Sequence, residues 1–66
     1  MILNSTRIRS VEYNDSTEVL TLDFFKGGKY KYYSVPETIY NGIIKSASPG
    51  AYFDANIKMK YNYKKA

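Results

Sequence analysis

FFKGGKYKYYSVP, at residues 24–36, sets the topology of this chain of 66 residues. It begins with the apolar end of one strand and continues, after two glycines, as a strand in which tyrosine and lysine alternate. Gly27 and Gly28 supply the positive φ angles of a tight hairpin, so residues 18–25 and 29–35 are expected to pair antiparallel. The Ser-Val-Pro at its end, followed by Glu37, is typical of a helix start.

A third strand is expected over residues 6–13, although its apolar residues do not alternate strictly. Ile8 is out of phase with Val11 and Tyr13. A β-bulge near Arg9 would return all three to one face, because one inserted residue shifts the pleat. The polar residues 14–17 then predict a turn into the strand at 18–25, whose core-facing residues are Leu20, Leu22 and Phe24.

The helix after the hairpin is expected to run from Ser34 to Ala47. Ser34 and Glu37 fit a capping box, in which each side chain bonds a free amide of the first turn. One apolar stripe follows with a period of 3.6 residues, and Ser48-Pro49-Gly50 is expected to end the helix. The stripe consists of Ile39, Ile43, Ile44 and Ala47. Gly42 inside the helix predicts close packing against an aromatic ring.

A second, shorter helical turn is expected over residues 52–58, with Tyr52, Phe53 and Ile57 packed inward. Residues 58–65 predict a short edge strand or an extended strap. The chain is therefore expected to be a single α+β domain over residues 1–66: a three- to four-stranded antiparallel meander, one main helix on a face, and a short second helical turn.

Charge is divided unevenly along the chain, whose net charge is +4. Residues 1–25 hold two arginines and four carboxylates, a balance of −2, whereas residues 26–66 hold eight lysines and two carboxylates, a balance of +6. Such asymmetry is typical of a polyanion-binding surface, although an ordinary soluble domain can carry the same net charge.

Histidine and cysteine are both absent. The chain therefore lacks the usual proton-transfer residue near neutral pH, the strongest nucleophile and any thiolate metal site. The six carboxylates are scattered, so neither catalysis, a metal nor a cofactor is expected. No apolar segment approaches the ~20 residues of a membrane span, and the start is too short for a signal peptide. We expect a cytoplasmic protein with no membrane partner.

The two faces of the strand at 29–35 are expected to differ in role. Tyr30 and Tyr32 share one face and are expected in the core beneath the helix. Tyr33 lies on the other face with Lys29 and Lys31, where a ring could stack on an unpaired base while cations meet phosphates. Arg7 and Arg9, or Phe25, are expected to adjoin this platform.

The C-terminal segment interleaves cations and aromatic rings more densely than solubility requires. It either packs its tyrosines inward as a strap or presents them to a ligand, and both readings can hold together. The residues predicted to bind nucleic acid are Arg7, Arg9, Lys29, Lys31, Tyr33, Lys58, Lys60, Tyr61, Tyr63 and Lys64.

Several motifs in order make the chain similar to the KTSC domain, a module named for its occurrence at the C-terminus of some lysyl-tRNA synthetases. They are Val11-Glu12-Tyr13, Tyr30-Lys31-Tyr32, Val35-Pro36, Ser48 to Asp54, and the terminal Tyr61-Asn62-Tyr63. The resemblance extends from Ser5 to Lys64, and it implies a small α+β fold and a role in binding nucleic acid.

These observations favour a non-catalytic binding module for nucleic acid, RNA or single strands before duplex DNA. One alternative is a small phage- or prophage-type interaction or inhibitor module that acts on a host protein through its tyrosines, which suit protein interfaces equally well. Another is an oligomer that captures a small anionic ligand, such as a nucleotide, between subunits.

Overall fold

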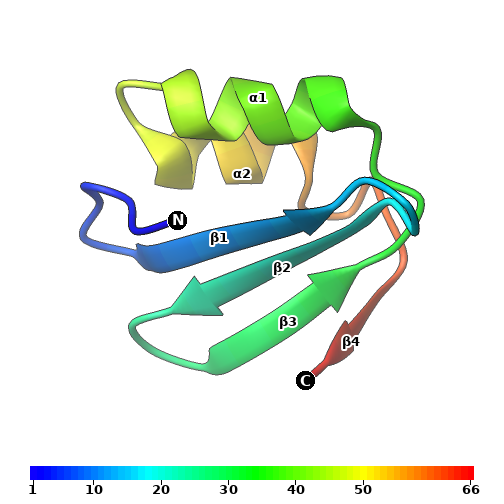
Figure 1. Ribbon diagram of the computed structural model, residues 1–66. Helices are drawn as coiled ribbons and strands as arrows, with labels where there is room; N and C mark the ends of the chain where they lie inside the picture. The colour runs from blue at the N-terminus through cyan, green and yellow to red at the C-terminus, as the bar shows by residue number, and fades with distance from the viewer.

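The computed structural model describes residues 1–66 as one four-stranded antiparallel sheet, in the order β1-β2-β3-β4, with two helices. Both helices lie on the same side of the sheet (Figure 1). This α+β arrangement is the predicted one. The elements are β1 (Ile8–Asn14), β2 (Val19–Phe24), β3 (Gly28–Tyr32), α1 (Glu37–Lys45), α2 (Pro49–Asn56) and β4 (Tyr63–Lys65).

The predicted bulge in β1 is confirmed. Ile8 pairs with Phe24, but Ser10 pairs with the adjacent Asp23, so one residue of β1 is left over between them. The shift returns Ile8 and Val11 to the core face, where both side chains are fully buried. Beyond β1, the side chain of Asn14 accepts bonds from the amides of Ser16 and Thr17, which forms the expected turn.

The β2–β3 hairpin also follows the prediction, with Gly27 at φ 103° and Gly28 at φ 83°. However, β3 ends at Tyr32 rather than at Val35. Ser34 has a left-handed φ of 57°, and the amide of Val35 donates to the carbonyl of Glu18 at 2.9 Å. The chain therefore leaves the sheet two residues after Tyr32 and crosses the β1–β2 turn.

The predicted capping box is wrong for the same reason. Helix α1 begins at Glu37, and Pro36 occupies the N-cap position without a side-chain hydrogen bond. Because Ser34 already adopts the left-handed conformation that anchors Val35, its hydroxyl lies outside the first turn. The helix also ends earlier than expected, at Lys45, so Ala47 is exposed instead of completing the apolar stripe.

Tyr13 joins the sheet to the start of α1. Its hydroxyl donates to the carbonyl of Val35 at 2.6 Å, and its ring stacks on Tyr40 with centroids 5.2 Å apart. Partial burial, helped by nearby carboxylates, raises the pKa of Tyr13. The phenol therefore keeps the proton that it donates, and the contact fixes the angle at which the helix leaves the sheet.

The core lies between the sheet and the two helices. Side chains with no exposed surface come from both layers, as the alternation of β2 and the stripe of α1 predicted. Tyr32 is buried in the same cluster, and Phe24 and Tyr30 pack against it half-buried. The fully buried set is Ile8, Val11, Leu20, Leu22, Val35, Ile43 and Ile57.

Helix α2 is longer than the helical turn expected there and begins within the Ser-Pro-Gly segment predicted to be only a stop signal. Pro49 occupies its first turn, where no amide is needed, and Pro49 and Gly50 are both buried. Phe53 and Ile57 pack inward as predicted. Neither helix of the protein has the length and apolar character needed to cross a bilayer.

Gly42 allows the two helices to approach closely. A β-carbon added there would overlap the ring and hydroxyl of Tyr52 from α2. The predicted contact with an aromatic ring is thus confirmed, and Tyr52 is the ring.

Replacing Gly42 with alanine is therefore expected to destabilise the protein by about 1–2 kcal/mol, because overpacking outweighs the ~1 kcal/mol that alanine gains in a helix. Urea unfolding measures the loss. Tyr52→Leu in the Gly42→Ala background removes the clashing ring and should recover part of it. A Gly42→Ala variant more stable than the wild type would show that the helices do not meet closely here.

Candidate nucleic-acid interface

The side of the sheet opposite the helices is uncovered, and we call it the open face (Figure 1). Strand alternation and register place one row of polar side chains across it. The row runs through all four strands as Glu12, Thr21, Lys31 and Lys64. A second row pairs Asp23 with Lys29.

Charge on the open face is segregated between its two halves. The carboxylates lie on β1 and β2 and have partners: Glu12 binds the N-terminal amine at 2.9 Å, and Asp23 lies 3.8 Å from Arg9. The lysines lie on β3 and β4, and Lys29, Lys31 and Lys64 form no ion pair. This half of the face therefore carries positive charge available to a ligand.

Tyr33 lies next to these lysines, immediately after β3. Its amide donates to the carbonyl of Asn62 at 2.9 Å, which holds the residue beside the start of β4. The side chain is 36% exposed and, with Lys31 and Val19, lines a shallow hollow of about 310 Å³. We call Lys29, Lys31, Lys64 and Tyr33 together the basic edge.

Arg9 and Phe25 occupy the other end of the open face. The Arg9 guanidinium lies 5.0 Å from the centre of the half-exposed Phe25 ring, and it also reaches Asp23. This cation–π contact, together with the ion pair, gives Arg9 partners within the chain. Phe25 was expected only as a neighbour of the platform, and the structure adds it as a second exposed ring on the open face.

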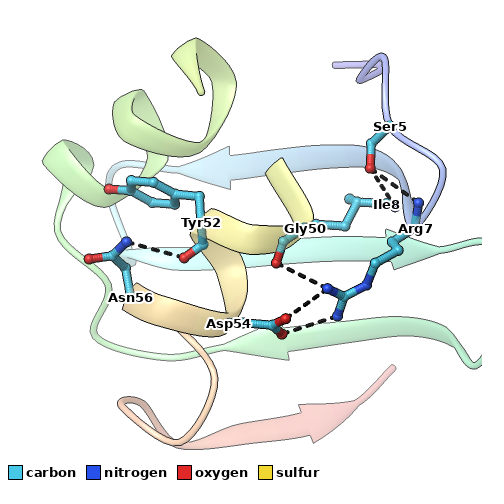
Figure 2. A network of polar contacts seen from close by, with 7 residues as sticks. All are labelled: Ser5, Arg7, Ile8, Gly50, Tyr52, Asp54 and Asn56. Atoms are coloured by element: carbon cyan, nitrogen blue, oxygen red, sulfur yellow. Dashed lines mark hydrogen bonds and ion pairs between the residues drawn. The ribbon is translucent and has the colours of Figure 1, made fainter. Parts of the chain in front are cut away.

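Arg7 points to the helix side and is engaged there. Its guanidinium donates to both carboxylate oxygens of Asp54, at 2.8 and 3.1 Å, and to the carbonyl of Gly50 at 3.3 Å (Figure 2). The hydrogen-bonded pair raises the pKa of Arg7 and lowers that of Asp54. Arg7 therefore ties the start of β1 to α2 and lies apart from the basic edge.

The other predicted residues are also away from the open face. Tyr61 packs against the core, and Tyr63 contacts the rings of Tyr30 and Tyr32 on the helix side. Lys58 lies near Tyr63, while Lys60 belongs to the connection between α2 and β4. The ten predicted residues thus divide between two sides of the sheet. Sequence alternation separated Lys64 from Tyr63 correctly but could not place either side relative to the helices.

The fold and this uncovered, partly basic sheet face define a small α+β module with one helical layer. The chain belongs to the KTSC domain family, whose domain matches residues 4–61. It is similar over 100% of its length to the crystal structure of a KTSC domain protein from Yersinia pestis, with 93% of that chain covered, a TM-score of 0.98 and 32% identity. The family resemblance inferred from sequence is thereby confirmed.

Curated relatives include a lysine–tRNA ligase from Trichormus variabilis, 36% identical over 56 residues, and one from Nostoc punctiforme, 30% identical over 56 residues. The matches take in 85% of this chain but only 10% of each ligase. An uncharacterized protein from Stutzerimonas stutzeri is 27% identical over 59 residues, which are 89% of this chain and 83% of that protein.

Proposed function

We propose that this protein is a non-catalytic module that binds single-stranded nucleic acid, RNA in the first place, through the basic edge. The observation that carries the proposal is the set of three lysines without ion-pair partners beside an exposed tyrosine, on a sheet face that no helix covers. Cations attract phosphates of any sequence, and an aromatic ring stacks on any base.

The spacing of the basic edge suits a flexible strand. Lys31 and Lys64 are register partners on neighbouring strands, about 5 Å apart, and Lys29 lies two residues along β3, about 7 Å from Lys31. One short stretch of backbone could contact all three while a splayed base reaches Tyr33. Because no side chain set for reading base edges accompanies them, sequence preference should be weak.

The relatives support RNA over DNA. A homologous segment forms part of proteins named lysine–tRNA ligases, so the same module occurs in proteins that handle RNA. This support is by analogy of domain, since function resides in sites and not in folds. A protein partner held by the exposed tyrosines remains the competing outcome, and its binding would depend little on salt.

Replacing Tyr33 with alanine should weaken binding to a short oligouridylate by roughly 1–3 kcal/mol, because one stacked base is lost. Fluorescence anisotropy with labelled RNA measures the change. A double-stranded RNA of equal length is the matched control ligand, since its paired bases cannot reach the ring. Equal losses on both ligands, or none on either, would count against stacking on Tyr33.

A further inference from the structure

A second hollow opens on the helix side of the sheet, beyond the part covered by the helices. Its volume is about 240 Å³, and its lining comes from β2, β3, β4 and the end of α2. The aromatic lining residues are Phe24, Tyr30, Tyr32, Phe53 and Tyr63. Lys58 and Met59 complete the wall, and we call this site the aromatic pocket.

The rings hold one another in fixed orientations. Tyr63 lies 5.7 Å from Tyr30 and 5.4 Å from Tyr32, centroid to centroid, and Phe53 meets Tyr32 edge-on at 5.7 Å. Tyr63 is nevertheless 59% exposed, so much of its ring faces solvent and not a neighbour. A rigid aromatic wall with a free ring face is a surface on which a flat aromatic group can stack.

Polar groups are also available at this site. Tyr13 is the residue whose phenol bonds within the protein, whereas the hydroxyls of Tyr30, Tyr32 and Tyr63 have no such partner. None of them is sealed from solvent without a partner, so even the hydroxyl of the nearly buried Tyr32 reaches the surface. Burial and the nearness of Tyr63 and Tyr30 raise the pKa of Tyr32, which stays a neutral donor.

The charge at the pocket is positive. Lys58 is the one ionic residue in its lining, and Lys65 pairs with Tyr30 on the same side of β4. The carboxylate that Lys58 can influence is Asp54, and Asp54 is held by both nitrogens of the Arg7 guanidinium. A ligand that complements this pocket is therefore flat, aromatic and anionic, and able to exchange hydrogen bonds with phenols.

We propose that the aromatic pocket binds one nucleotide, with its base stacked on Tyr63 and its phosphate beside Lys58 and Lys65. The inference rests on the proposed function for the class of ligand and adds a second site, for a free nucleotide or one base of a bound strand. A strand can reach both sites around β4, because this outermost strand carries Lys64 on the open face and Tyr63 on the other.

The test is an NMR titration of the wild-type protein with AMP, UMP and inorganic phosphate in separate series. Met59 is 89% exposed at the rim of the pocket, so its methyl signal is a local reporter. At about 1 mM nucleotide, we expect saturable shifts of Met59, Lys58 and Tyr63 with AMP and UMP, and none of that pattern with phosphate. Tyr63→Leu should weaken nucleotide binding about tenfold or more, whereas Tyr33→Leu should leave it unchanged.

Three outcomes would overturn the inference: no shifts at the pocket, the same shifts with inorganic phosphate, or the same shifts on changing protein concentration alone, which would indicate a second copy. A labelled oligouridylate separates this failure from that of the proposed function. If Lys31→Gln/Lys64→Gln weakens oligonucleotide binding but Tyr63→Leu and AMP have no effect, the pocket proposal alone is wrong. If AMP binds at the pocket while no oligonucleotide binds, the pocket stands and the open-face proposal is wrong.

Discussion

Leu22→Ala is expected to cost about 2–5 kcal/mol, the largest loss of stability from a single substitution considered for this domain. Leu22 is fully buried at the centre of the sheet, with Val11 and Tyr30 as its register partners on the two sides. A domain of this size has a total stability of only about 3–10 kcal/mol, so the variant is expected to be largely unfolded. Urea denaturation followed by tyrosine fluorescence measures the change.

Thr21→Ala is the matched control, because Thr21 is the preceding residue of β2 and faces the open side. Its effect on the free energy of unfolding should stay within about 0.5 kcal/mol. Equal urea midpoints for wild type and Leu22→Ala would contradict the assignment of core and open faces on which the binding surface depends.

Local pattern was sufficient to predict most of the sheet. The alternation of β2 placed Leu20 and Leu22 in the core, the two glycines placed the hairpin, and the phase error in β1 placed the bulge. Gly42 likewise signalled a close approach, because glycine is costly in a helix unless something occupies the space of its missing side chain. These features depend on backbone geometry and short-range periodicity, which sequence expresses directly.

Features set by distant partners were not predictable in the same way. Ser34 fits a helix cap locally, but bonds from Val35 to Glu18 and Tyr13 place it in a left-handed turn instead. Arg7 was expected to adjoin the platform, but its partner Asp54 is 47 residues away on α2. Met59 was expected opposite the lysines of a strand or strap, yet it lies in the turn before β4 and is almost fully exposed.

For the candidate site, sequence analysis identified the residue types and the strand faces but not how the faces are divided. It placed Lys29, Lys31 and Tyr33 together, as the structure does. It could not show that Tyr63 belongs with Tyr30 and Tyr32 on the helix side, because that depends on how the chain returns to pair β4 with β3.

Removing two cations from the basic edge should have the largest effect on binding. Lys31→Gln/Lys64→Gln keeps long polar side chains on the exposed face, so the fold should be retained while phosphate contacts are lost. Each contact contributes about 0.7 log units of affinity per tenfold change in salt, so the double variant should bind single-stranded RNA roughly 100-fold more weakly at about 0.05 M salt. Fluorescence anisotropy at that salt concentration measures the loss.

Lys26→Gln/Lys45→Gln is the matched control, because it removes the same net charge from the hairpin turn and the end of α1. Long-range attraction alone should make this control bind only a few-fold more weakly than wild type, since these lysines touch no phosphate in the proposed complex. Equal losses in the two double variants would mean that net charge, and not the basic edge, drives association.

The most direct test of the central claim is the salt dependence of RNA binding by the wild-type protein. If the basic edge holds a single strand through its three lysines, a plot of log affinity against log salt should fall with a slope near −2, about −0.7 for each phosphate contact. The slope should flatten to about −0.7 in Lys31→Gln/Lys64→Gln. A wild-type protein that shows no binding at low salt and micromolar concentration, or binding whose strength does not change with salt, would contradict the account.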